Sequence, residues 1–132
     1  MMKVKFPGGK KVDAIFKGFT FKTDQPCESG GEGSAPDPFS MFLASLATCS
    51  GFFVKNFCDQ RGIDAREIEL FLNTDSNDEL GKITAFHLEI NVPAEFPAKY
   101  EKALVQTAKL CKVKKHLDPQ ISFNCFVTRK GS

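Results

Sequence analysis

The chain has 132 residues, of which 42% are hydrophobic and 26% are charged, the composition of an ordinary globular protein. This length supports one hydrophobic core but not two independent ones, so we expect a single domain spanning residues 1–132. Eighteen basic and sixteen acidic residues give a formal net charge of +2. No surplus of positive charge is available to neutralise a string of phosphates, and nucleic acid is therefore not an expected partner.

The cysteines and the N-terminus indicate a reducing compartment. Five cysteines are an odd number, and no two of them are separated by only two residues, so neither a secreted disulfide framework nor a zinc site is indicated. The two histidines have no paired spacing, which again argues against a metal. Residues 1–9 lack the apolar run of a signal peptide. We expect a cytoplasmic protein with reduced thiols, no metal and no cofactor.

The first half of the chain predicts three strands and a long helix. Alternating apolar residues predict strands over 4–6, 12–16 and 19–21, joined as an antiparallel meander. Residues 24–37 are polar and glycine-rich, and we expect a mobile surface loop there. Asp37 followed by Pro38 is a typical helix start, and the helix is predicted to run to about Gln60, ending near Gly62.

The beginning of this helix is apolar or small on all sides, which predicts a helix wrapped by protein at the centre of the core. The uncharged stretch from Pro38 to Val54 is at the short limit for crossing a bilayer, and serine and threonine residues interrupt it. We therefore expect a buried helix and no membrane partner.

The second half predicts two strands, a helix and a last strand. Apolar residues alternate over 68–72 and 86–92, with a polar loop over 74–78 between the two strands. A second helix is predicted from near Pro97, with Tyr100, Leu104, Ala108 and Cys111 on one face. A last strand is predicted over 121–127. This order of elements predicts an α+β fold of antiparallel sheets packed on two main helices.

Cys49 lies about three turns inside the first helix, on an apolar stripe. A buried free cysteine is most often an inert apolar residue. Cys58 is nine positions further along, on the opposite side of the same helix, so the two thiols cannot pair. Cys111 is the other cysteine predicted to be helical and on an apolar face. Packing of the two helices could bring Cys49 and Cys111 within bridging distance, which requires Cα atoms no more than about 7 Å apart.

Two motifs carry a family resemblance. Pro38 is followed eleven residues later by Cys49 within the segment PFSMFLASLATCS, which resembles the first cysteine motif of the OsmC/Ohr family of osmotically inducible and organic hydroperoxide resistance proteins. Cys111-Lys112-Val113 is similar to the second motif, a cysteine usually followed by Pro-Val or Ser-Val. The predicted order of strands and helices also fits this family, so the resemblance covers nearly the whole chain.

The resemblance implies an intertwined homodimer with an oxidative stress function. In the family, a cysteine matching Cys49 reduces an organic hydroperoxide, a cysteine matching Cys111 resolves the resulting sulfenic acid as a disulfide, and a dithiol or a protein reductant recycles the pair. A thiolate is the nucleophilic form of cysteine, and a nearby thiol traps sulfenic acid before further oxidation. An apolar pocket for the hydroperoxide is predicted from Phe39, Phe42, Phe52 and Phe53, although such residues are more often core.

The sequence departs from the peroxidase branch of this family at two positions. Phe39 follows the motif proline, where peroxidases carry a glutamate, and no arginine precedes Arg61. One of the N-terminal lysines is the alternative source of positive charge. These departures keep a rival interpretation open: a non-catalytic dimeric domain of the same fold that binds a small apolar ligand or has a stress-related structural role.

A basic run follows the second helix, with Lys109, Lys112, Lys114, Lys115 and His116. Such a run is most often a solvated face that complements the helix dipole. The functional alternative is that Lys112 or His116 lowers the pKa of Cys111 or attracts an anionic ligand.

Overall fold

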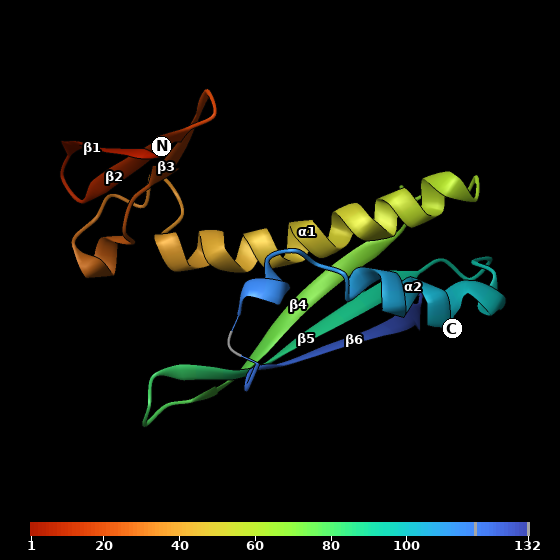
Figure 1. Cartoon of the computed structure of the whole chain (residues 1–132). Helices are drawn as coiled ribbons and strands as arrows, with labels where there is room; N and C mark the ends of the chain where they lie inside the picture. The colour runs from red at the N-terminus through yellow and green to blue at the C-terminus, as the bar shows by residue number, and fades with distance from the viewer. Residues whose placement is uncertain (118, 132) are drawn as a thin grey trace. The chain divides into compact units, whose positions relative to one another are not determined.

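The computed structural model describes residues 1–117 and 119–131. The chain divides into two compact units, residues 1–44 and 45–132. The elements in chain order (Figure 1) are β1 (Lys3–Gly8), β2 (Lys11–Phe16), β3 (Phe19–Thr23), the short 3₁₀ turn η1 (Cys27–Ser29), α1 (Pro38–Gln60), β4 (Glu69–Asn77), β5 (Lys82–Val92), η2 (Ala98–Tyr100), α2 (Glu101–Ala108), η3 (Lys114–His116) and β6 (Ser122–Arg129).

The N-terminal unit holds an antiparallel meander in the order β1-β2-β3, as the alternation predicts. Ala14 of the central strand lies opposite Val4 on one side and Phe21 on the other. The turn between β2 and β3 has positive φ angles at Lys17 (52°) and Gly18 (81°). A two-residue turn of this kind matches the twist of the strands that it joins.

The segment after β3 is organised around a buried carboxylate. Asp24 is only 1% exposed and accepts hydrogen bonds from the backbone amides of Gln25 (2.8 Å) and Ser34 (3.1 Å) and from the Ser34 hydroxyl (2.6 Å). The Ser34 hydroxyl and these amides lower the pKa of Asp24 to about 2. A Cβ on Gly31 would lie 2.0 Å from the Gln25 carbonyl oxygen, so glycine is required there. The sequence predicted a mobile surface loop and missed this centre.

Helix α1 has the predicted boundaries. Asp37 precedes it and accepts hydrogen bonds from the amide (3.4 Å) and the hydroxyl of Ser40, which satisfies part of the first turn. The helix ends before Gly62, whose φ of 66° is a left-handed conformation that favours glycine. By length and composition α1 is the one helix of the described residues that could cross a membrane, and 28% of its most apolar stretch is buried within the chain.

The second unit is built on the sheet β4-β5-β6, with β5 in the centre (Figure 1). Strands β4 and β5 form an antiparallel hairpin, and β4 continues to Asn77, through most of the segment predicted as a loop. Strand β6 pairs with β5 in parallel, with Leu88 opposite Cys125. A parallel partner requires a crossover connection, which α2 supplies. The α+β class is confirmed, with this last strand parallel rather than antiparallel.

Both helices contribute to one core on this sheet. Leu88, Ile90 and Val92 alternate along β5 with no exposed surface, and they pack with residues of α1 and α2. The helical members of this core are Val54, Phe57, Cys58, Leu104 and Ala108. The other sheet face is open: Phe71 and Phe126, which flank Glu89 in register, are 45% and 42% exposed.

Helix α1 is not wrapped on all sides, which corrects the sequence prediction. Its buried residues form one stripe: Leu46, Ser50, Val54, Phe57 and Cys58. Phe52, on another face, is 63% exposed. A helix with apolar residues on every face and only one buried stripe leaves apolar surface for a further contact.

Candidate redox site

Cys49 lies on α1 next to the buried stripe to which Leu46 and Ser50 belong, and it is itself partly buried. Ser50 has no exposed surface, and its hydroxyl donates to the carbonyl oxygen of Ala108 at 3.1 Å. This hydrogen bond joins the middle of α1 to the last residue of α2. Ser50 thus positions the cysteine-bearing turn of α1 against the segment that follows α2.

Cys111 lies beyond α2, not within it as the helical spacing predicted. The helix ends at Ala108, and the amide of Leu110 donates to the carbonyl of Thr107 at 3.0 Å in a tighter turn. Cys111 is fully buried, as expected. Its sulfur lies 3.9 Å from the carbonyl oxygen of Leu46 on α1, a contact in which the thiol is the donor.

Backbone amides of the residues after Cys111 donate hydrogen bonds to the sulfur atoms of both Cys49 and Cys111. The amide of Lys112 donates to the sulfur of Cys49 at 3.2 Å, and the amide of Lys114 donates to the sulfur of Cys111 at 3.4 Å. His116 donates from Nδ1 to the carbonyl of Lys112 at 2.8 Å, which closes the segment on itself. The structure therefore brings Cys49 and Cys111 together as two neighbouring free thiols.

The pKa values of the two thiols shift in opposite directions. Burial raises the pKa of Cys49, but the amides of Val113 and Lys112, the Cys111 thiol and the Lys112 charge outweigh it, so the pKa is lowered. Burial also raises the pKa of Cys111, and there the Cys49 thiolate adds to the increase, against the amide of Lys114. Hydrogen bonds to the charged form favour that form. The thiolate is therefore favoured at Cys49 and the protonated thiol at Cys111, so the basic run does not lower the pKa of Cys111, as the functional alternative drawn from the sequence had it.

Two other cysteines show the opposite shift to Cys49. Burial is the main cause that raises the pKa of Cys58 on α1 and that raises the pKa of Cys125 on β6 to about 11. A buried protonated thiol behaves as a small apolar residue. Of the four cysteines Cys49, Cys58, Cys111 and Cys125, Cys49 is the one whose thiolate is favoured.

The four phenylalanines predicted to line a substrate pocket lie along α1 in two pairs. Phe39 and Phe42 have ring centroids 5.7 Å apart, and Phe52 meets Phe53 edge-on at 5.4 Å. Phe39 and Phe52 are exposed. Their role in binding a hydroperoxide stays a prediction.

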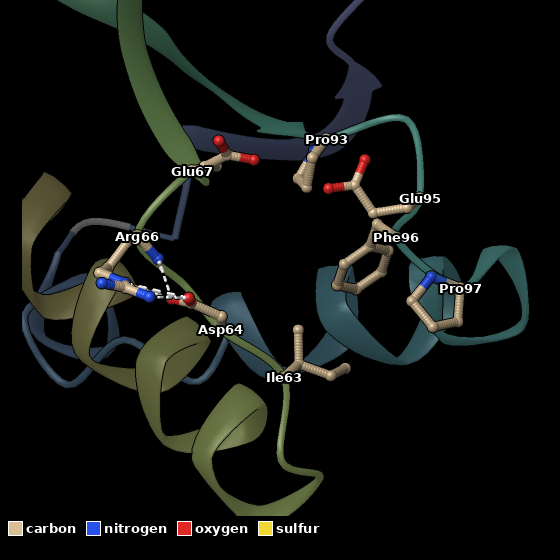
Figure 2. A pocket seen from close by; sticks show the side chains of 8 residues that line it. All are labelled: Ile63, Asp64, Arg66, Glu67, Pro93, Glu95, Phe96 and Pro97. Atoms are coloured by element: carbon tan, nitrogen blue, oxygen red, sulfur yellow. Dashed lines mark hydrogen bonds and ion pairs between the residues drawn. The ribbon is translucent and has the colours of Figure 1, made fainter.

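A pocket of about 440 Å³ lies elsewhere in the second unit, between the loop after α1 and the turn after β5 (Figure 2). It is lined by Ile63, Asp64, Arg66, Glu67, Pro93, Glu95, Phe96 and Pro97. Arg66 forms an ion pair with Asp64 at 2.6 Å, and the lining contains neither a cysteine nor a histidine. This pocket therefore has no nucleophile of the kind that the thiol pair provides.

Comparison with known proteins places the chain in a family. The family model described as "OsmC-like protein" matches residues 31–126, which include both cysteines of the site. The chain belongs to the OsmC-like family. A comparison with curated protein sequences finds no match.

Solved structures share the fold of this OsmC-like chain. A candidate osmotic stress induced and detoxification response protein from Psychrobacter arcticus is 23% identical, with a TM-score of 0.78 over 96% of this chain and 93% of the other. An OsmC-like protein from Mycoplasma pneumoniae is 16% identical, with a TM-score of 0.72 over 98% and 95%. An organic hydroperoxide resistance protein from Legionella pneumophila is 19% identical, with a TM-score of 0.59 over 97% and 95%.

Sequence reasoning missed two features of the site. The sequence places Ser50 directly after Cys49, but its pattern marks Ser50 only as a polar interruption of the apolar helix. The amides of Lys112 and Val113 act through the backbone, which leaves no residue signature. The one available signal was the second motif itself, because it places these two residues directly after Cys111.

Proposed function

We propose that this OsmC-like protein is a thiol-dependent peroxidase that reduces organic hydroperoxides through Cys49 and Cys111. The observation that carries the proposal is a pair of neighbouring thiols whose pKa values shift in opposite directions. A thiolate beside a protonated thiol is the arrangement that peroxide reduction with resolution requires. The OsmC-like family, and the organic hydroperoxide resistance for which the structurally similar Legionella pneumophila protein is named, support the same chemistry.

The proposed reaction consumes one hydroperoxide and two thiols. The Cys49 thiolate attacks one peroxide oxygen, an S–O bond forms, the O–O bond breaks, and the alcohol leaves after it takes up a proton. The thiolate of Cys111 then attacks the sulfenic sulfur, an S–S bond forms and the S–O bond breaks. Hydroxide leaves and takes the Cys111 proton as water. A dithiol reductant restores both thiols by two exchange steps and leaves as its own disulfide.

Lys112 and its neighbours supply the electrostatics that an N-terminal arginine would otherwise provide. The Lys112 amide reaches the Cys49 sulfur at 3.2 Å, and the amide of Val113 and the Lys112 charge also favour the thiolate. Backbone amides act at fixed positions and need no rearrangement when charge develops. The absence of a carboxylate at Phe39 leaves the hydroperoxide to be oriented by other groups.

A disulfide map after oxidation tests the proposal. One equivalent of cumene hydroperoxide is expected to convert the reduced protein to a Cys49–Cys111 disulfide, with release of one equivalent of alcohol. Cys49→Ser is expected to abolish the reaction, and Cys111→Ser to leave a sulfenic acid that dimedone traps. Cys125→Ser is the matched control and should react like the wild type. Slow oxidation scattered over several cysteines would refute the peroxidase proposal.

The rival function is a non-catalytic OsmC-like domain that binds a small apolar ligand or has a stress-related structural role. The observation that favours it is Phe39, an exposed aromatic ring where peroxidases carry a carboxylate. The same oxidation experiment separates the two functions, because the rival predicts neither a Cys49–Cys111 disulfide nor the release of one equivalent of alcohol.

We also propose that the protein is a homodimer. The apolar residues exposed in the second unit include Phe52 on α1, Phe71 on β4 and Phe126 on β6. A stable interface buries about 800 Å² on each partner, with aromatic residues enriched at its centre. Aromatic side chains exposed on a core helix and on one sheet face are what a second copy would cover.

Sedimentation velocity tests the dimer. The wild type is expected to sediment with twice the chain mass. Phe52→Asp is expected to raise the dissociation constant at least about tenfold, because a charge replaces an aromatic ring that the proposed interface would cover. Asn56→Asp adds the same charge on α1 without removing an apolar group and should leave the dimer intact. A monomeric wild type would contradict the dimer, and a dimer that tolerates Phe52→Asp would contradict this interface.

A further inference from the structure

A second pocket of the C-terminal unit combines apolar walls with lysines. It has a volume of about 340 Å³, and its lining comes from β5, from the segment between Cys111 and β6, which includes the basic run, and from the start of β6. The lining residues are Phe86, Lys114, Lys115, Leu117, Pro119, Ile121 and Phe123. Five of these seven residues are apolar. The volume is at the small end of the range for ligand pockets.

The walls and the rim of this pocket have different chemistry. Phe86 is almost fully buried, and its ring lies 6.4 Å from that of Phe123, so aromatic surface forms one wall. The Lys114 ammonium lies 5.3 Å from the Phe123 ring centroid, and Lys115 is exposed. Within residues 1–117 and 119–131, no carboxylate forms an ion pair with Lys114 or Lys115.

We propose that this pocket binds an amphiphilic monocarboxylate, a short apolar chain that ends in one carboxylate group. The apolar chain removes the aromatic and aliphatic walls from water, and the carboxylate accepts hydrogen bonds from the two ammonium groups at the rim. Charge complementarity selects this ligand class over a neutral or a cationic one. A nucleic acid is disfavoured, because the net charge of +2 and two lysines offer few phosphate contacts.

The pocket adjoins the thiol pair through one residue. Lys114 contributes its side chain to the pocket and its amide to the sulfur of Cys111, at 3.4 Å. A carboxylate bound at the Lys114 ammonium group would therefore contact the same segment whose Lys112 amide donates a hydrogen bond to the Cys49 sulfur. The binding itself needs no thiol chemistry, so the inference goes beyond the proposed peroxidase function and does not depend on it.

A titration of the ¹⁵N-labelled protein with octanoate, followed by NMR, tests the pocket. Octanoate is expected to shift the amide signals of Lys114, Lys115, Ile121 and Phe123 in a saturable manner. Octylammonium, with the same chain and the opposite charge, should bind at least about tenfold more weakly, and octan-1-ol should lie between the two. Cys49→Ser should bind octanoate like the wild type, which separates this result from any failure of the peroxidase proposal.

Two variants assign the binding to this pocket. The double variant Lys114→Gln/Lys115→Gln is expected to weaken octanoate binding about 5- to 30-fold, since each exposed ion pair contributes modestly. Its control, Lys99→Gln/Lys102→Gln, removes the same charge outside the pocket and should bind normally. Ile121→Glu places a carboxylate in the pocket and should abolish binding while the protein stays folded by circular dichroism.

Three results would overturn the proposal. The first is octylammonium binding as tightly as octanoate. The second is unchanged octanoate affinity in the Lys114→Gln/Lys115→Gln variant. The third is a pocket already covered by a second copy, in which case the same amide signals shift with protein concentration and do not respond to octanoate.

Discussion

Iodoacetamide is expected to alkylate Cys49 at least about tenfold faster than Cys125 at pH 7. A thiol with a pKa of about 11 is ionised to about one part in 10⁴ at this pH, whereas the lowered pKa of Cys49 leaves a much larger share of that thiol as thiolate. The Cys125 thiolate is the stronger nucleophile, which offsets part of this advantage but not all of it. Mass spectrometry of quenched time points measures both rates. Equal rates would contradict an activated Cys49.

The pH dependence of this alkylation reports the role of Lys112. Because a cation favours the thiolate, Lys112→Gln is expected to raise the Cys49 pKa and to slow alkylation at pH 7, with the midpoint of the pH–rate profile moved upward. Lys112→Arg keeps the charge and should restore the midpoint. Lys102→Gln, on α2, is the control for loss of a distant charge. An unmoved midpoint in Lys112→Gln would assign the activation to the backbone amides alone.

The distinction between charge and amides matters because this chain lacks two groups of the peroxidase pattern. Phe39 replaces the carboxylate, and no arginine precedes Arg61. The amide of Lys112 is fixed by the chain itself, and the Ser50–Ala108 hydrogen bond keeps α1 next to the segment that carries it. A thiolate can thus be favoured here without an N-terminal arginine. In the proposed reaction, the amide of Lys112 and the Ser50–Ala108 hydrogen bond do not orient the hydroperoxide, so other groups must do so.

The sequence predicted the elements that have local signals. Helix α1 begins at Pro38 after Asp37 and ends before Gly62, because capping residues and glycine mark both ends. The strands of the N-terminal meander follow from alternation alone. Helix α2 has no glycine or proline near Ala108, so the periodicity extended it to Cys111. The chain leaves the helix there, where Cys111 packs against Leu46.

Features that depend on contacts between distant parts of the chain could not be predicted from the sequence. The parallel pairing of β6 depends on the path of the crossover, and alternation is the same for parallel and antiparallel neighbours. Nothing in the sequence marks Asp24 as a buried carboxylate, since the amides that donate hydrogen bonds to it belong to residues up to ten positions away. Resemblance selected the pair Cys49 and Cys111, but spacing alone did not. The amides that distinguish the two thiols have no side-chain signature.

Leu104→Ala is expected to cost about 2–5 kcal/mol of the free energy of unfolding, the usual range for a buried leucine that leaves a cavity. Leu104 has no exposed surface and joins α2 to a core with Leu88 and Val54. Single domains are stable by only about 5–15 kcal/mol, so this loss is a large share of the total. Urea unfolding at one fixed protein concentration measures it, with an unchanged m value showing that the change is in stability.

Leu80→Ala is the matched control, because Leu80 is 67% exposed and its truncation should change stability by less than about 0.5 kcal/mol. The contrast also bears on the site. Helix α2 carries Ala108, the acceptor of the Ser50 hydroxyl, so a loosened α2 weakens the link that keeps Cys111 beside Cys49. Leu104→Ala should therefore slow Cys49–Cys111 disulfide formation even where the protein remains folded, and Leu80→Ala should not. Equal disulfide rates in the two variants would mean that the thiol pair is held by α1 and the Lys112 segment alone.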